Sequence, residues 1–192
     1  MKIFTSLYDR ALIWSRHKNA PAILSGVSFA ESVIFPIPVD VMLAPMAIAQ
    51  PSRAMYFAML TTIFSVLGGM AGYLLGYLAF EPIVLPALDY FGRMDTFELA
   101  QGWFNDWGFW VIFLAGFSPI PYKVFTVTAG VMAIAFLPFV LASIIGRGMR
   151  FFLVAWLMRW GGPIMEKHVR QHMDTIGWGV VILAVAAYFI FR

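Results

Sequence analysis

Two segments organise this sequence: Phe35-Pro36-Ile37-Pro38-Val39-Asp40 and Ser118-Pro119-Ile120-Pro121-Tyr122-Lys123. In each segment, two prolines stand at positions i and i+2 inside an apolar stretch. A proline lacks the backbone N–H that a helix requires, and its ring crowds the preceding turn. We therefore predict a helix break at each proline pair: Pro36 with Pro38, and Pro119 with Pro121.

The apolar stretches around these breaks cover residues 21–50 and 107–136. On each side of the prolines, the apolar segment is shorter than the about 20 residues that a membrane-spanning helix requires. Broken backbone is tolerated at membrane depth only where protein buries it or where it lines a water-filled cavity. Each stretch is predicted to form a re-entrant hairpin, which enters the membrane, turns at the prolines and leaves on the same side. The alternative is a single span with a proline kink.

Three further segments are apolar enough to be ordinary spans: residues 53–80, 137–160 and 175–191. Hydrophobic residues make up 61% of the 192-residue chain, and charged residues make up only 12%. Soluble domains average about 45–50% apolar and about 25% charged residues, and a small domain leaves much of its surface in water. The composition therefore predicts a single all-α membrane domain over residues 1–192.

The proline segments belong to an internal repeat. Met46-Ala-Ile-Ala49 matches Met132-Ala-Ile-Ala135, and Pro51 matches Pro138 at the start of the following span. Each unit, a hairpin plus a span, crosses the membrane once, so the two units must have opposite orientations. Inverted repeats with broken helices are typical of transporters, whose site lies at the repeat interface. We predict this architecture, with residues 175–191 as an extra C-terminal span.

The charges of the loops predict an orientation. In this topology one side of the membrane holds most of the basic residues: Lys2, Arg10, Arg16, Lys18, Arg53, Arg159, Lys167 and Arg170. The positive-inside rule therefore places the N-terminus in the cytoplasm. Residues 1–20 are predicted as an amphipathic helix on that surface, and residues 81–106 as a polar loop or interfacial helix on the other. The N-terminal residues lack the apolar core of a signal peptide, so we expect no cleaved leader.

Five ionisable residues fall inside the apolar stretches, where a charge is costly and suggests function. The acids Glu31 and Asp40 flank the first break, and the bases Lys123, Arg147 and Arg150 follow the second. Asp40 and Lys123 occupy equivalent positions of the repeat, so we expect them to approach each other near the midplane. A guanidinium suits phosphate because it stays charged and donates two parallel hydrogen bonds. We predict that the three bases bind phosphate and that the two acids couple to protons or act as a gate.

Three functions are consistent with these charges. The first is translocation of a phosphate-bearing lipid, whose head group meets the bases while its tails stay in the membrane. The second is proton-coupled export of small cations or drugs by Glu31 and Asp40. The third is a non-transporting membrane scaffold, in which the charges form ion pairs that fix the repeat interface.

Catalysis, metal binding and nucleic-acid binding are not expected. The chain has no cysteine, and Ser118 has no histidine near it in the sequence. His168 and His172 are spaced for a metal on one helix, but they lack a third ligand. The basic residues are scattered rather than clustered on one polar element. We expect no enzyme activity and no cofactor; protons are a candidate partner, and homo-oligomer formation is left open.

Small residues recur along the span 53–80. Gly68, Gly69, Gly72 and Gly76 lie on one side of that helix. Small residues at this spacing let another helix approach the backbone. We predict close helix packing at this face.

These motifs resemble those of the DedA family of bacterial membrane proteins, which shares a domain with the SNARE-associated Golgi (VTT) proteins. The resemblance covers nearly the whole chain and is strongest to the YqaA-like branch. Its matching stretches are Ser28-Phe29-Ala30-Glu31-Ser32, Phe35–Asp40, Gly116–Thr126 and Ser143–Phe152.

The resemblance implies a lipid-carrier transporter or scramblase of the bacterial inner membrane. The implied substrates are undecaprenyl phosphate or phospholipids, in support of envelope homeostasis. It also implies roles for Glu31, Asp40 and Lys123, because the family carries acids on both sides of the first break and bases around the second. Many members have an arginine before the second break, where this chain has Phe117 and Ser118. Arg147 and Arg150 are candidates to replace it.

Overall fold

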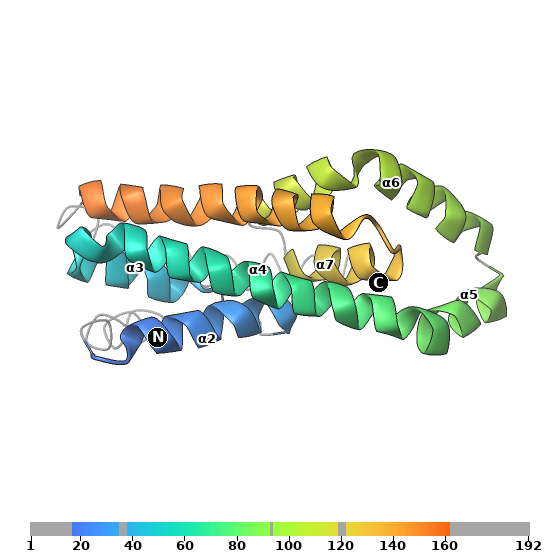
Figure 1. Cartoon of the computed structure of the whole chain (residues 1–192), viewed down its shortest axis with the longest axis horizontal. Helices are drawn as coiled ribbons and strands as arrows, with labels where there is room; N and C mark the ends of the chain where they lie inside the picture. The colour runs from blue at the N-terminus through green and yellow to red at the C-terminus, as the bar shows by residue number, and fades with distance from the viewer. Residues whose placement is uncertain (1–16, 35–37, 93, 119–121, 162–192) are drawn as a thin grey trace, which may run out of the picture.

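The computed structural model describes residues 17–34, 38–92, 94–118 and 122–161, which are almost entirely helical and include no strand (Figure 1). Two helices within these ranges are long and apolar enough to cross a membrane, Pro51–Phe91 and Phe136–Gly161. The predicted all-α class is therefore confirmed. The predicted span 175–191 and nearly all of the predicted helix 1–20 lie outside the described residues.

The central helix is α4, Ala54–Ala79, which agrees with the predicted first span. A short 3-10 turn, Pro51–Arg53, leads into it. A π-helical turn, Phe80–Val84, then connects it to α5, Leu85–Phe91, so that helical structure continues over 41 residues. Gly92 ends α5 with a φ of +59°, a left-handed conformation that glycine adopts without steric cost.

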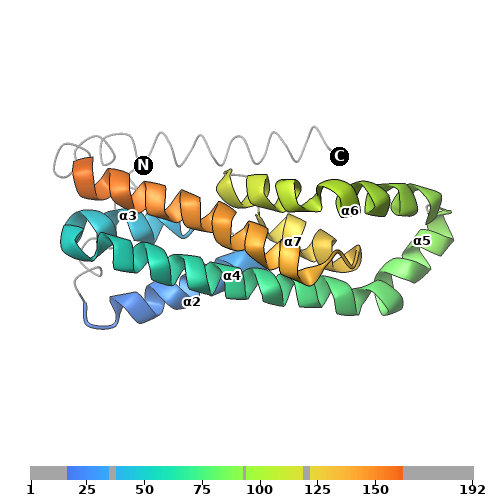
Figure 2. The ribbon, with the colours of Figure 1, turned by 45° about the horizontal axis from the view of Figure 1, so that its top comes forward.

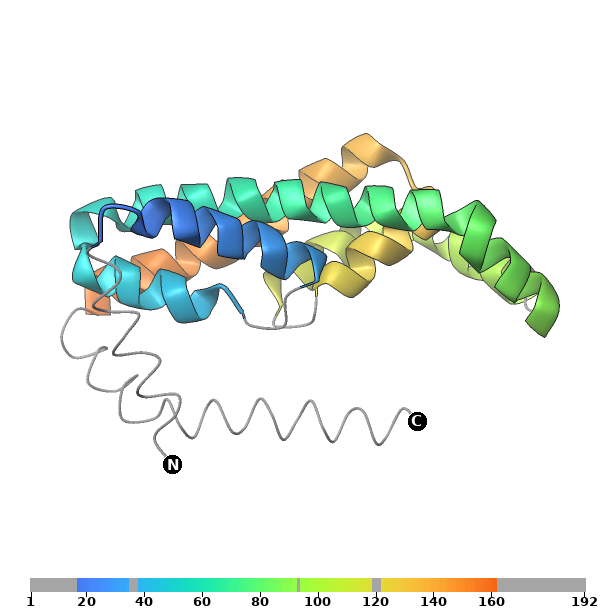
Figure 3. The ribbon, with the colours of Figure 1, turned by 90° about the horizontal axis from the view of Figure 1, so that it is seen from below.

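The first proline segment separates α2, Ala20–Val33, from α3, Asp40–Ala49. Pro38 lies in this break, and α3 begins just after it. α2 runs toward the middle of α4, and α3 runs back to the end of the bundle where α2 begins (Figures 1 and 3). We call α2 and α3 the first helix pair.

The second proline segment separates α6, Met94–Phe117, from α7, Tyr122–Val131. These two helices, the second helix pair, enter from the opposite end of α4 (Figure 2). The predicted hairpin begins at residue 107, whereas α6 begins at Met94 and includes much of the segment predicted as a polar loop or interfacial helix. No proline interrupts residues 94–117, so the helix continues through its polar part.

The helix Phe136–Gly161 completes the bundle and agrees with the predicted span 137–160. It is drawn in orange without a label in Figure 1, and we call it the arginine helix. The connection that precedes it turns at Ala133, which has a φ of +52°. The side chains of Tyr73 and Gln101 donate to carbonyls of this connection at 2.6 and 2.8 Å. They satisfy groups that the end of α7 leaves without helical partners.

Glycines of α4 allow both helix pairs to approach its backbone. A Cβ atom at Gly68 would overlap the Phe29 carbonyl of α2. A Cβ atom at Gly69 would lie 2.6 Å from the hydroxyl of Tyr122 in α7, and one at Gly76 would overlap the backbone of the same helix. The predicted close packing is therefore confirmed.

The buried apolar side chains form two clusters. One joins the first helix pair to the start of α4 and the end of the arginine helix, around Leu24, Leu43 and Phe57. The other joins the second helix pair to the start of the arginine helix, around Ile112 and Phe139. Between them lie buried polar side chains, which we call the polar layer: Ser28, Ser32, Thr61, Thr62, Ser65, Thr126, Ser143 and Arg147.

The outward faces of the long helices are apolar. Leu67, Leu74 and Leu78 of α4 are exposed, as are Ile145 and Met149 of the arginine helix. Soluble monomers rarely expose contiguous apolar patches of this kind. Apolar residues outside and polar residues inside are the distribution expected where hydrocarbon is the surrounding solvent.

Candidate functional site

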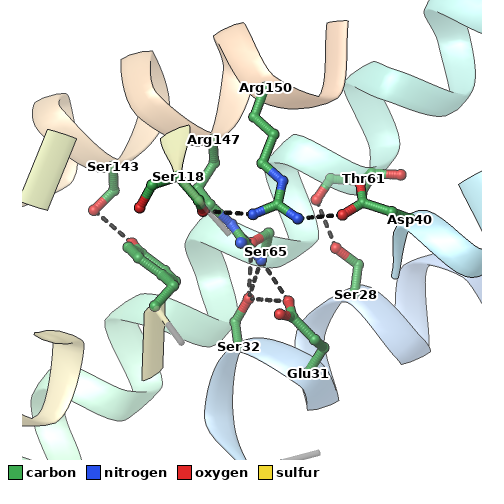
Figure 4. Close-up of polar contacts among 11 residues, drawn as sticks. Ser28, Glu31, Ser32, Asp40, Thr61, Ser65, Ser118, Ser143, Arg147 and Arg150 are labelled. Atoms are coloured by element: carbon green, nitrogen blue, oxygen red, sulfur yellow. Dashed lines mark hydrogen bonds and ion pairs between the residues drawn. The ribbon is translucent and has the colours of Figure 1, made fainter. Parts of the chain in front are cut away.

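Two acids and two arginines meet in the polar layer, where the two helix pairs turn (Figure 4). Glu31 lies in the last turn of α2, and Asp40 is the first residue of α3. Arg147 and Arg150 lie in the middle of the arginine helix. Glu31 pairs with Arg147, and Asp40 pairs with Arg150. We call these four residues the charged centre.

Arg147 is enclosed by protein, with a side chain that is only 2% exposed. Its Nε donates to Ser65 Oγ at 2.6 Å. Its Nη2 donates to Glu31 Oε2 and, at 3.2 Å, to Ser32 Oγ. A buried charge is very costly unless it is paired and hydrogen-bonded. Here α2 and α4 supply those partners, so the cost is largely offset.

Two aromatic rings cover the guanidinium of Arg147. The ring centroids of Tyr122 and Phe151 each lie 4.7 Å from its Cζ, within the range of a cation–π interaction. The Tyr122 hydroxyl donates to Ser143 Oγ at 2.6 Å, and Ser143 donates to the Phe139 carbonyl at 2.7 Å. Arg147 therefore joins both helix pairs to α4.

Arg150 has fewer partners and is less enclosed. Its side chain is 19% exposed, and that of Asp40 is 24% exposed. Arg150 Nη2 donates to Asp40 Oδ2, and Nη1 donates to the Ser118 carbonyl at 2.6 Å. Asp40 Oδ1 and Ser118 Oγ are buried, and neither finds a hydrogen-bond partner in the ranges that the structure describes. The Arg150 pair thus keeps hydrogen-bonding capacity that its protein surroundings do not use.

Lys123 lies in the first turn of α7 and reaches the first break. Its Nζ donates to the Ile34 carbonyl at 3.2 Å. The last carbonyls of a helix lack intrahelical partners, so a lysine at the end of α2 is well placed. The basic partner that the structure gives to Asp40 is Arg150, three residues beyond Arg147 on the arginine helix.

Hydroxyl groups complete the polar layer. Ser32 Oγ and Ser65 Oγ are 2.7 Å apart, and Ser28 donates to the Thr61 carbonyl at 2.6 Å. In hydrocarbon, helices gain little from apolar contact with one another, and hydrogen bonds between small polar side chains help to join them. These bonds fix α2 against α4 at the depth where Glu31 meets Arg147.

An apolar groove of about 430 Å³ opens on the surface of the bundle. It lies between the start of α4, the end of α6 and the arginine helix, and its lining residues are Met55, Phe117, Met149, Phe152, Leu153 and Trp156. Phe117 directly precedes Ser118, and Met149 directly precedes Arg150.

The structure brings four of the five predicted charged residues together, and the fifth, Lys123, contacts the first break. Among the described residues, no three His, Asp or Glu side chains gather in a way that could hold a metal. Pro38 lies in the first break. The other predicted break residues and two of the histidines lie outside the described residues: Pro36, Pro119, Pro121, His168 and His172.

Sequence reasoning missed the neutral partners of the charged centre, which are Ser32, Ser65, Tyr122 and Ser143. A signal was present in the sequence. Ser28 and Ser32 are spaced i, i+4, as are Thr61 and Ser65, and each pair stands in an otherwise apolar helix. Polar residues at that spacing share one helix face and mark it as a face that contacts other polar groups.

A helical bundle with an apolar exterior and buried ion pairs defines a helical membrane protein. Residues 37–160 match the family model of the VTT domain, and the chain belongs to this family, the DedA family. The matched range contains Asp40, Arg147 and Arg150, while Glu31 lies just before it.

Two relatives align over the full length of both chains. An uncharacterized protein of Haemophilus influenzae is 48% identical over 192 residues, covering 100% of each chain. An uncharacterized protein of Histophilus somni, a homologue of HI0703, is 47% identical with the same coverage. No solved structure matches this chain.

Proposed function

We propose that this protein translocates an anionic, phosphate-bearing lipid across the bacterial inner membrane, as a transporter or scramblase that supports envelope homeostasis. Undecaprenyl phosphate and phospholipids share the required chemistry, a phosphate head group on a hydrocarbon tail. The observation that carries the proposal is the Arg150 pair: Arg150 is partly exposed, its partners Asp40 and Ser118 each keep a polar atom without a partner among the described residues, and the residues before Arg150 and Ser118 line an apolar groove.

The position of the charges favours a transport role over a purely structural one. A charged side chain at the bilayer centre costs about 2.5–3.5 kcal/mol on insertion scales, and a buried ion pair seldom adds net stability. A scaffold accounts for Arg147, whose hydrogen bonds are made within the protein. It accounts less well for Arg150, whose neighbours Asp40 and Ser118 each keep a polar atom without a partner in the described chain.

We infer that both helix pairs lie in the membrane as re-entrant hairpins of an inverted repeat. α2, α3 and α7 have 14, 10 and 10 residues, which is short of the about 20 that a spanning helix needs, and the 24-residue α6 is apolar only in its second half. The pairs approach the middle of α4 from opposite ends (Figures 2 and 3). With α4 as a span, the charged centre falls near the midplane, where transporters of this design hold their substrate.

The orientation follows from the positive-inside rule. Lys18, Arg53 and Arg159 lie at the end of the bundle where the first helix pair enters. That end then faces the cytoplasm, and so does the N-terminus. The second helix pair opens toward the other side.

Charge and polarity favour a lipid over a small cation as the substrate. The centre and its neighbour Lys123 hold three bases against two acids, so a cation would meet net repulsion there. A phosphate would meet Arg150, and the groove offers an apolar surface to a hydrocarbon tail. Export of small cations through Glu31 and Asp40 is the weaker proposal on these grounds.

The test is head-group movement in proteoliposomes. Fluorescent phospholipids and a polyprenyl phosphate are compared, with wild type beside Arg150→Met and with protein-free vesicles as the blank. Arg159→Met is the matched control, because it removes an exposed arginine from the same helix outside the charged centre. We expect lipid movement in wild type and in Arg159→Met, and its loss in a folded Arg150→Met protein.

The same assay separates the alternatives. No movement of any lipid by wild type, at neutral or alkaline pH, would sink the lipid proposal and favour proton-coupled export. If wild type moves no lipid and the charge-removing variants of the charged centre also fail to fold, a scaffold is favoured over an exporter. The lipid that moves fastest identifies the preferred head group.

A further inference from the structure

The two ion pairs of the charged centre differ in how many of the polar atoms around them have hydrogen-bond partners within the protein. Arg147 donates to three side chains and lies between two rings. Backbone also presses on this part of the helix, because a Cβ atom at Gly146 would lie 2.5 Å from the Phe113 carbonyl. No ligand can reach Arg147 without separating helices that are packed to the backbone.

The Arg150 pair has the opposite character. The guanidinium is held by a carboxylate oxygen of Asp40 and by the Ser118 carbonyl. The second oxygen of Asp40 and the hydroxyl of Ser118 are buried without a partner among the residues described. Buried polar atoms are nearly always hydrogen-bonded, so two beside one arginine call for an explanation. Phe117 and Met149, the residues that precede Ser118 and Arg150 in the chain, line the apolar groove.

We propose that Asp40 acts as a resident anion, which occupies the phosphate position on Arg150 until a phosphate head group displaces it. This inference rests on the proposed function and names the exchange that occurs at its site. The incoming phosphate takes the hydrogen bond from Arg150 Nη2, and the hydroxyl of Ser118 donates to a second phosphate oxygen. The tail of the lipid lies in the groove that Phe117 and Met149 line.

The exchange solves an electrostatic problem. An arginine without a counter-ion in a membrane is expensive, so an open site needs an anion that leaves when the substrate arrives. Replacing one oxyanion by another keeps the guanidinium paired throughout. Asp40 is the first residue of α3, and the partial positive charge of a helix N-terminus stabilises its carboxylate after release. The fixed Glu31–Arg147 pair holds the helices in place during the exchange.

The experiment measures binding to the purified full-length protein in detergent. Isothermal titration calorimetry is carried out with octyl phosphate and with inorganic phosphate, so that the two arms separate a lipid-like ligand from the free anion. Asp40→Asn removes the competing charge and keeps the side-chain shape. We expect octyl phosphate to bind up to about fivefold more tightly to Asp40→Asn than to wild type, the factor that corresponds to losing one partly exposed ion pair.

Three further variants make the result specific. Arg150→Gln is expected to abolish binding, and Ser118→Ala is expected to weaken it about fivefold, because one hydrogen-bond donor is lost. Glu31→Gln is the matched control, an acid-to-amide change at the other ion pair, and is expected to give no gain in affinity. Thermal unfolding of each variant identifies those that are folded.

The two possible roles of Asp40, resident anion and structural residue, predict different combinations of phosphate binding and lipid transport. If Asp40 is the resident anion, Asp40→Asn binds octyl phosphate more tightly but moves lipid more slowly in vesicles, because the phosphate no longer meets a competitor that drives its release. Equal or weaker binding by folded Asp40→Asn and unchanged binding by Ser118→Ala would each overturn the inference. Tighter binding by Asp40→Asn without lipid movement by wild type would keep the exchange and reject the proposed transport.

Discussion

Arg147 and Arg150 are separated by a single turn of the same helix, yet their surroundings differ in every respect that determines a role. Arg147 is buried, covered by two rings and bonded to α2 and α4. Arg150 is partly exposed and bonded to a carboxylate and a carbonyl at the two breaks. Residue type and spacing do not distinguish a structural arginine from an exchangeable one. The number of hydrogen bonds that the protein itself completes does.

The largest expected loss of stability comes from replacing Arg147. Arg147→Met removes a buried guanidinium with hydrogen bonds to three side chains and leaves the partly exposed Glu31 without its ion partner, so we expect a loss of about 3 kcal/mol in stability. Arg150→Met should cost about 1 kcal/mol, since both side chains of this ion pair are partly exposed. Thermal unfolding in detergent measures both. Glu31→Gln with Arg147→Met should recover part of the loss, and a single Arg147→Met variant as stable as wild type would contradict the assignment.

A smaller loss of stability is expected where α4 packs against Tyr122. Gly69→Ala places a methyl group 2.6 Å from the Tyr122 hydroxyl, and Tyr122 covers the guanidinium of Arg147. We expect a cost of about 2 kcal/mol from overpacking, seen as a lower unfolding temperature. Gly26→Ala is the matched control, because nothing lies within 4 Å of its added methyl group. That control should be neutral or slightly stabilising, and equal losses at both glycines would argue against close packing on α4.

The hydroxyl of Tyr122 offers a finer test. Tyr122→Phe keeps the ring over Arg147 and removes the hydrogen bond to Ser143. We expect a cost of about 1 kcal/mol, the usual net value of one hydrogen bond, with lipid movement retained. Tyr122→Leu should cost more, because it also removes the cation–π contact. If the two variants unfold at the same temperature, the ring contributes nothing to holding Arg147.

The smallest expected change lies on the Arg150 side. Ser118→Ala deletes a buried hydroxyl that has no partner among the described residues. We expect a change within about 0.5 kcal/mol, because no protein hydrogen bond is lost. The carbonyl that holds Arg150 stays in place. A clearly larger loss of stability would show that the hydroxyl of Ser118 does have a structural partner.

Much of the fold followed from proline chemistry. Asp40 and Tyr122 each begin a helix just after a break, as the missing N–H groups require. The start of α6 was missed because hydropathy detects only its apolar part. Its polar half carries Asp95 and Glu98, which lower the hydropathy without breaking a helix. Hydropathy reports where a helix meets lipid rather than where it begins.

The two copies of the internal repeat do not share the same backbone conformation throughout. Met46–Ala49 is helical as the end of α3, whereas the matching residues 132–135 form a turn with Ala133 in the left-handed region. The same four residues adopt different backbone conformations in the two copies, because Tyr73 and Gln101 from other helices donate hydrogen bonds to the backbone of the second copy. Local sequence cannot encode such tertiary contacts.

The sequence predicted which charged residues lie at the site, but not which acid pairs with which base. Intramembrane charge marked Glu31, Asp40, Arg147 and Arg150, because such residues are costly wherever they are placed. Equivalence within the repeat directed attention from Asp40 toward Lys123, whereas Asp40 pairs with Arg150. Which base meets which acid depends on how the arginine helix crosses α4, and no spacing along the chain records that crossing.

The polar layer and the two apolar clusters differ in how they would interact with water. Within each cluster, parting the helices would expose hydrocarbon to whatever entered the gap. In the polar layer between them, the surfaces that part carry hydroxyls, carboxylates and guanidinium groups, all of which water solvates well. The free-energy cost of hydration is therefore lowest in the polar layer. A water-filled path through the protein would form first in the middle of the bundle rather than at either end.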